Sequence, residues 1–340
     1  MPGAPASRCL LVSALALCAL CCAACGTVDP NPRTRKGPLP ARSEVPLSVL
    51  FPQMPLESAR VEDTHATEAQ ATASYTSFFS QSGNGDSFAQ EDGELLVGTA
   101  SARHGVGAGM ELGVLVPVLY TTSGFLDSFI NHYHDLFGLP DSGRDHQPDD
   151  QWEALMMNDG QAAWQMSEDR VGLGDIPLWW AIQLADENDT GAAVKAKVLC
   201  ELPTGSVHDG FGSGTVDVGA QLLIEKGIDR WVVYGAVAGF LPGTPRDFRS
   251  AGVDVNPYFE VSGGSELRLT TAWSLLAQLD YLSSPMHDFP ASTASDDQLL
   301  VSYGAAFDVG DLTVNLFMIE NLIGDSTPDF TVQAGITARF

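Results

Sequence analysis

The feature that most limits the fold of this chain is a long, regular alternation of apolar and polar side chains. Between residues 266 and 281, the sequence ELRLTTAWSLLAQLDY places Leu267, Leu275 and Leu279 on one side and Glu266 and Asp280 on the other. Successive side chains of a strand point to opposite faces, so one face of this strand meets an apolar and the other an aqueous environment. Soluble strands usually run about 5–6 residues, whereas a strand that crosses a bilayer needs about 9–11. We therefore expect a membrane strand over residues 265–283, with a long strand of a soluble sandwich as the alternative.

The same alternation recurs along most of the chain and predicts twelve strands. Amphipathic strands without long helices between them can bury their apolar faces in a soluble sandwich, or against lipid as a closed antiparallel barrel. An even strand number is what single-chain bacterial barrels require. The predicted ranges are 66–81, 92–104, 106–120, 174–185, 193–203, 213–226, 229–241, 252–263, 265–283, 297–308, 311–320 and 328–340.

The connections between these strands alternate between short and long, which favours the barrel. Tight turns are predicted at 104–105, 226–228, 262–264 and 310–311, and the largest connection runs from 121 to 173. Outer-membrane barrels have short periplasmic turns and longer outer loops. The predicted fold is thus an all-β transmembrane antiparallel barrel of about 12 strands over residues 64–340.

The loop over residues 121–173 is expected to contain structure of its own. In GFLDSFINHYHDLFGLP, Phe125, Phe129, Tyr133 and Phe137 recur at helical spacing and predict one amphipathic helix, which we expect to act as a plug at the barrel mouth. Two short apolar stretches flank Asp159-Gly160, a hairpin signal. If this hairpin crosses the membrane, the barrel has 14 strands.

The start of the chain indicates export. Residues 1–25 combine Arg8, an apolar run and small residues before Cys25, which predicts a signal peptide. The stretch Cys22-Ala23-Ala24-Cys25 is similar to a lipoprotein cleavage site, so Cys25 is a candidate lipid anchor, with plain cleavage after Ala24 as the alternative. Residues 26–63 are rich in proline and predict an extended linker.

The charge balance points to the function. The chain has 17 basic and 43 acidic residues, which argues against binding nucleic acid. The alternation places ten of the acidic and four of the basic residues in the lumen, where an excess of acids favours cations. The acidic positions predicted to face inward are Glu111, Asp175, Glu201, Asp217, Glu225, Asp254, Glu260, Glu266, Asp280 and Asp308, and the basic ones are Lys195, Lys197, Arg268 and Arg339.

These features predict an outer-membrane pore or passive uptake channel for a small polar or cationic solute. The alternatives are a structural barrel without transport and, less favoured, a lipid hydrolase, which uses a histidine with a serine. We expect no enzyme activity, catalytic residue, cofactor or metal site. In the cluster from His132 to Asp135 the two histidines do not share a helix face, so it is read as a solvated polar surface. The expected partners are outer-membrane lipid and the machinery that assembles barrels.

Several stretches resemble a known family. They are GPLPARSEVPLSVLF, PLESARV, GFLDSFINHYHDLFGLPDSGRD, GLGDIPL, ELPTGS and GSGTVDVGAQLL. Over residues 37–340 the chain resembles the uncharacterised bacterial family catalogued as domain of unknown function 3187. The resemblance implies a barrel in a Gram-negative outer membrane. It supplies neither a substrate nor functional residues.

Overall fold

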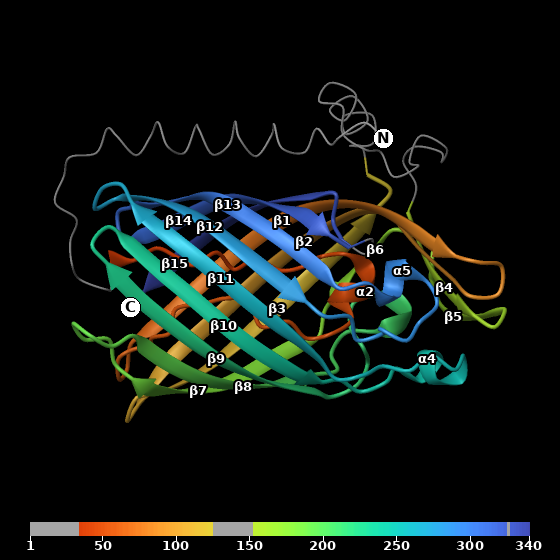
Figure 1. Ribbon diagram of the computed structural model, residues 1–340, viewed down its shortest axis with the longest axis horizontal. Helices are drawn as coiled ribbons and strands as arrows, with labels where there is room; N and C mark the ends of the chain where they lie inside the picture. Colours follow the sequence, from red (N-terminus) through yellow and green to blue (C-terminus); the bar gives the residue numbers. More distant parts are fainter. Residues whose placement is uncertain (1–33, 125–151, 325–326) are drawn as a thin grey trace, which may run out of the picture.

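The alternating stretches form the wall of a barrel in the computed structural model, which describes residues 34–124, 152–324 and 327–340 (Figure 1). Strand β1 pairs with β2 on one side and with the last strand, β15, on the other, which closes the ring. All neighbouring strands of the ring are antiparallel, and closure gives each of the twelve ring strands a neighbour on both sides. The twelve ring strands are β1 (Thr67–Gly83), β2 (Phe88–Gly107), β3 (Met110–Thr122), β7 (Ile176–Ala185), β8 (Ala193–Leu202), β9 (Asp217–Ile228), β10 (Trp231–Leu241), β11 (Tyr258–Arg268), β12 (Trp273–Leu282), β13 (Gln298–Val309), β14 (Leu312–Ile323) and β15 (Phe330–Arg339).

The twelve-strand prediction is confirmed, and the fourteen-strand alternative is wrong. The hairpin of β4 (Glu153–Asn158) and β5 (Gln161–Met166) pairs through β4 with the first residues of β2, beyond the ring. The short β6 (Arg170–Leu173) pairs with the end of β3. All three strands therefore extend the sheet past one end of the barrel. The predicted helix around Phe125 to Phe137 lies outside the described residues.

The structure differs from the prediction that the stretch 266–281 forms a single strand. It is the hairpin of β11 and β12, with its turn between Arg268 and Trp273. The expected turn at 262–264 is part of β11 instead. Leu267 pairs with Leu275 across the hairpin, so the apolar residues on both sides of the turn keep the same face. The alternation therefore correctly predicted on which face of the sheet each side chain lies, but it did not indicate the turn.

The outer surface of the barrel is an apolar belt. Outward side chains such as Val198, Ile224 and Leu279 are exposed, while their strand neighbours that point inward are buried. Aromatic pairs lie near both ends of the belt: Trp273 stacks on Phe307, with ring centroids 4.5 Å apart, and Phe259 lies 5.7 Å from Tyr281. Aromatic girdles on either side of an apolar band are typical of membrane barrels.

The connections are short at one end of the barrel and long at the other. The short-turn end includes residues 108–109 between β2 and β3, close to the turn predicted at 104–105, and residues 310–311 between β13 and β14. The long-loop end carries the small helices η3 (Val207–Asp209), α4 (Arg246–Ser250) and α5 (Ser292–Ser295). Within the described ranges, no helix has the length and apolar character needed to cross a membrane.

Candidate functional site in the barrel lumen

Residues 34–62, here called the luminal segment, run through the inside of the barrel (Figure 1). The sequence predicts a linker for these residues; the segment is extended for most of its length, but it lies within the ring rather than ahead of it. Its prolines remove backbone donors and disfavour pairing with the wall as a further strand. Its regular structure includes one helical turn, α2 (Pro46–Val49).

Inward glutamates of the wall bind the backbone of the luminal segment. A buried N–H group needs an acceptor, and a segment without sheet partners must find one among side chains. Each of five wall carboxylates accepts at least one such bond, at 2.6–3.2 Å. The pairs are Leu47 N with Glu91, Met54 N with Glu260, Ala59 N with Glu225, Glu62 N with Glu111, and Lys36 N and Gly37 N with Glu266.

A cluster of ion pairs holds both ends of the segment at the short-turn end of the barrel. The Arg35 guanidinium lies 2.7 Å from Glu187 and 2.5 Å from Glu225. Arg60 pairs with the same two carboxylates. Glu187, in the connection between β7 and β8, is only 12% exposed, yet burial is outweighed by hydrogen bonds from Arg35 and the Gly227 backbone and by the two guanidinium charges. Together these interactions lower the pKa of Glu187 to about 2.

Acidic residues of the segment meet basic groups and hydroxyls of the wall. Glu57 lies 2.7 Å from Lys195 and 2.8 Å from Lys197, both on β8. Glu62 pairs with Arg103 on β2 at 3.0 Å. The carboxylate of Glu44 accepts hydrogen bonds from Ser74 and Thr76 of β1. The segment and the wall are therefore complementary for both signs of charge.

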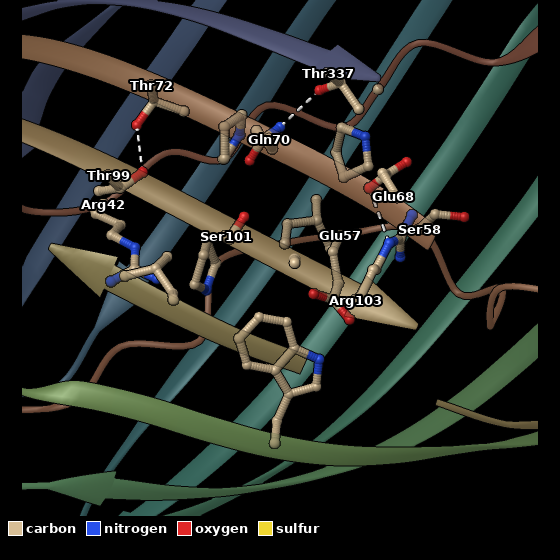
Figure 2. Close-up of a pocket in the computed structure, with 18 of the residues that line it drawn as sticks. Arg42, Glu57, Ser58, Glu68, Gln70, Thr72, Thr99, Ser101, Arg103 and Thr337 are labelled. Atoms are coloured by element: carbon tan, nitrogen blue, oxygen red, sulfur yellow. Dashed lines mark hydrogen bonds and ion pairs between the residues drawn. The ribbon is translucent and has the colours of Figure 1, made fainter. Parts of the chain in front are cut away.

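Three of the cavities between the segment and the wall adjoin one another. The largest, about 460 Å³, lies at the short-turn end and shares Arg35, Arg103 and Arg339 with a central cavity of about 130 Å³ (Figure 2). The central cavity shares Arg42 and Glu44 with a third, of about 50 Å³, towards the long-loop end. The charged side chains around the central cavity are Arg35, Lys36, Arg42, Arg103, Lys197 and Arg339 with Glu44, Glu57 and Glu68.

Arg42 differs from the other cations of the lumen. Figure 2 shows its side chain at the central cavity, and it lines both this cavity and the third one. Among the described residues it has no hydrogen-bond partner and no carboxylate within 4.0 Å, although Glu44 and Glu201 influence it electrostatically. Its charge therefore faces the remaining space of the lumen.

Most of the acids and bases predicted to line the lumen lie inside the barrel and are buried. Asp308 is partly exposed at the short-turn end, where Lys36 approaches it to 2.6 Å. Asp254 is exposed in the connection before β11, because that strand begins only at Tyr258 and not at the predicted 252. Phe125, Phe129, Tyr133 and Phe137, together with the candidate anchor Cys25, lie outside the described residues.

The sequence patterns did not reveal the residues that the luminal segment contributes, above all Arg35, Arg42, Glu57 and Arg60. The segment has no periodicity, so nothing local indicates its position. One signal was available, because the segment carries basic residues in a chain whose predicted wall is strongly acidic.

The described histidines lie at strand ends or in connections. His104 shares a 2.8 Å hydrogen bond with Thr67, and His287 lies 3.4 Å from Asp288. Within the described part of the chain, no histidine is hydrogen-bonded to a serine hydroxyl. The hydrolase alternative therefore gains no support from the described residues.

A closed ring of twelve antiparallel strands, an apolar belt outside and buried charges inside define the fold of the outer-membrane β-barrels. A family model described as "Protein of unknown function (DUF3187)" matches residues 12–340, and the chain belongs to this family. Among solved structures, the COG4313 outer membrane channel from Pseudomonas putida F1 is similar, with a TM-score of 0.56 and 13% identity over 85% of this chain and 100% of that chain. The NanC porin gives a TM-score of 0.45 and 6% identity over 80% and 98%. No curated protein matches this chain.

Proposed function

We propose that the protein is a passive outer-membrane channel for small polar solutes, and that the luminal segment occupies its lumen until it is displaced. The observation that carries this proposal is the series of three adjoining cavities beside a segment that belongs to no strand of the wall. A barrel of this size can be filled by its own wall side chains or can enclose a passage. Here the space is filled by a segment that pairs with no strand of the wall. The segment can therefore leave the lumen while the wall stays intact.

The charges of the wall favour cations once the segment moves. The bonds that hold the segment end on inward carboxylates such as Glu225, Glu260 and Glu266. Movement of the segment removes Arg35 and Arg60 from Glu225 and Lys36 from Asp308, and leaves an acidic surface in contact with water. Rings of acidic side chains select cations in channels.

Single-channel recording in planar bilayers tests the proposal. The double variant Arg35→Gln/Arg60→Gln removes the ion pairs at the short-turn end, so it should open more often than the wild type and should prefer cations. Arg246→Gln, in the exposed helix α4, is the matched control and should behave as the wild type. A preference for anions in the open state would contradict the charge argument.

The second candidate function is a structural barrel without transport. The observation that favours it is an apolar cluster at the long-loop end, in which residues of the segment pack against the wall. The cluster includes Leu47, Leu50 and Phe51 of the segment with Phe78, Phe240 and Phe248. If the wild type and the double variant are both silent in bilayers, this second function is the correct one.

The helix expected at the barrel mouth remains a prediction, since its residues are not among those described. If it narrows the mouth, deleting residues 124–138 should raise the single-channel conductance. The cation preference should not change, because the acidic wall is untouched.

A further inference from the structure

Three buried carboxylates converge at the long-loop end of the barrel. Asp175 precedes β7, Glu201 lies near the end of β8, and Asp217 is the first residue of β9. Each offers an oxygen within 4.8 Å of an oxygen of the others. Glu201 and Asp217 are directly opposed in the register of β8 and β9, an arrangement that is unfavourable for two like charges.

The protein supplies donors to two of these carboxylates but not to the third. Asp175 accepts N–H groups of Gly205 at 2.7 Å and Ser213 at 2.9 Å. Asp217 accepts the hydroxyls of Ser213 at 2.7 Å and Thr215 at 2.9 Å, and the N–H of Gly243 at 2.5 Å.

Glu201 is only 7% exposed, yet it has no hydrogen-bond donor and no cation within 4.0 Å among the described residues. Arg42 acts on it only from a greater distance. A buried carboxylate without a partner is strongly unfavourable, and this one is directed at two further carboxylates. At least one negative charge of this cluster must therefore be neutralised, either by a proton or by a bound cation.

Space for a hydrated ion adjoins the cluster. The lining of the cavity of about 50 Å³ includes Asp175, Glu201 and Ser43, with Arg42 and Glu44 also at its wall. The hydroxyl of Ser43 is buried without a hydrogen-bond partner. A water needs only about 10–15 Å³ of such volume and polar groups to bind. Waters in this cavity can complete the coordination of an ion.

We propose that Asp175, Glu201 and Asp217 bind one divalent cation of the hard, oxygen-binding class, for which Ca²⁺ is the natural probe. All the ligand atoms are carboxylate oxygens, with neither nitrogen nor sulfur in the set. Ca²⁺ accepts six to eight oxygens in irregular arrangements, whereas Mg²⁺ demands a near-ideal octahedron. Asp175 and Asp217 are fixed by backbone amides of two different connections, and such a set of carboxylates suits the less demanding ion.

The bound ion joins the start of β7 to its neighbours β8 and β9, because its ligands are Asp175 just before β7, Glu201 of β8 and Asp217 of β9. The donors Gly205, Ser213 and Gly243 belong to the connections after β8 and β10. Binding of the ion therefore stabilises the long-loop end. This inference concerns a site outside the ion pairs of the luminal segment and does not depend on transport.

Calorimetric titration of the purified, chelator-treated protein in detergent with CaCl₂ tests the site. The wild type should bind one Ca²⁺ per chain, and Ca²⁺ should raise its melting temperature. Glu201→Gln should weaken binding more than tenfold and abolish most of the rise. Asp254→Asn, which changes an exposed acid elsewhere, is the control and should bind as the wild type.

Glu201→Gln is chosen because it removes no hydrogen bond of the described structure. In chelator, without a cation, it should melt at the same temperature as the wild type or higher, since it removes an unpartnered charge. No Ca²⁺ binding by the wild type overturns the proposal, and so does wild-type affinity in Glu201→Gln.

Discussion

Glu225 shows how single wall residues hold the luminal segment. Its two carboxylate oxygens accept hydrogen bonds from the Ser58 hydroxyl, the Ala59 backbone and the guanidinium groups of Arg35 and Arg60. Its side chain is only 1% exposed. Removing one partner of a buried charge pair is costly because the other charge is left without compensation.

Glu225→Gln should therefore lower the free energy of unfolding by about 3–5 kcal/mol. Urea unfolding in detergent measures this loss. Asp186→Asn changes an exposed acid at the same end of the barrel and should leave stability almost unchanged. Equal effects of the two substitutions would show that the cluster around Glu225 does not hold the segment.

Glu187 makes the stability of this end depend on acid. Its pKa is lowered from 4.5 to about 2 in the folded protein, so its contribution to stability is complete above the unfolded pKa. The contribution is lost as the pH falls from 4.5 towards 2. The melting temperature of Glu187→Gln should therefore be below that of the wild type at pH values above this window, and the difference should shrink within it. A difference that is constant across the window would contradict the ion-pair cluster.

At the scale of the strands, the sequence predicted much of the barrel wall but not the luminal segment that lies inside it. Alternation indicates the facing of each side chain, and it gave the number of ring strands. It could not locate the turn between Arg268 and Trp273, because Leu269-Thr270-Thr271-Ala272 contains none of the glycine, proline, asparagine or aspartate residues that usually mark a turn. The predicted positions of Asp254 and of the β2–β3 turn were wrong for a related reason, because the alternation does not define where a strand begins or ends.

The outward face of β12 gives a direct test of the membrane wall. Leu279 is exposed between the aromatic residues Trp273 and Tyr281, where lipid is expected. Ala277→Arg, on the same face midway between these two aromatic residues, should destabilise the barrel by about 2–4 kcal/mol, the cost of arginine near the middle of a bilayer. Val309→Arg, outward beside the Gly310 turn, should cost only about 0–1 kcal/mol. Unfolding from lipid vesicles measures both, and equal losses would argue against a lipid-facing belt.

At the scale of the whole molecule, the luminal segment was beyond sequence-based prediction for a physical reason. Its partners are wall carboxylates and amides far away in the chain, such as Glu260 for Met54 and Gln183 for Ala59. Proline-rich sequence without periodicity indicates neither a face nor a partner. Only the closed barrel brings these groups around the segment.

The arrangement of the connections predicts the orientation in the membrane. Long loops are outside in such barrels and short turns are periplasmic. A cysteine introduced as Asp288→Cys, exposed in the β12–β13 connection, should react with an impermeant reagent on intact cells. A cysteine introduced as Asp311→Cys, in the β13–β14 turn, should react only after lysis. The reverse pattern would contradict the orientation.

The proposal that the luminal segment can leave the lumen is tested most directly by crosslinking the segment to the wall. A Cβ atom at Gly264 would lie 3.0 Å from the Leu56 side chain, so Leu56→Cys and Gly264→Cys place two thiols within reach of a short crosslink. In a Cys25→Ser/Cys200→Ser background, bilayer recordings of this variant should show channel openings when reduced and none when fully crosslinked. Openings of unchanged frequency and conductance in the crosslinked protein would contradict the proposal that the segment controls the lumen.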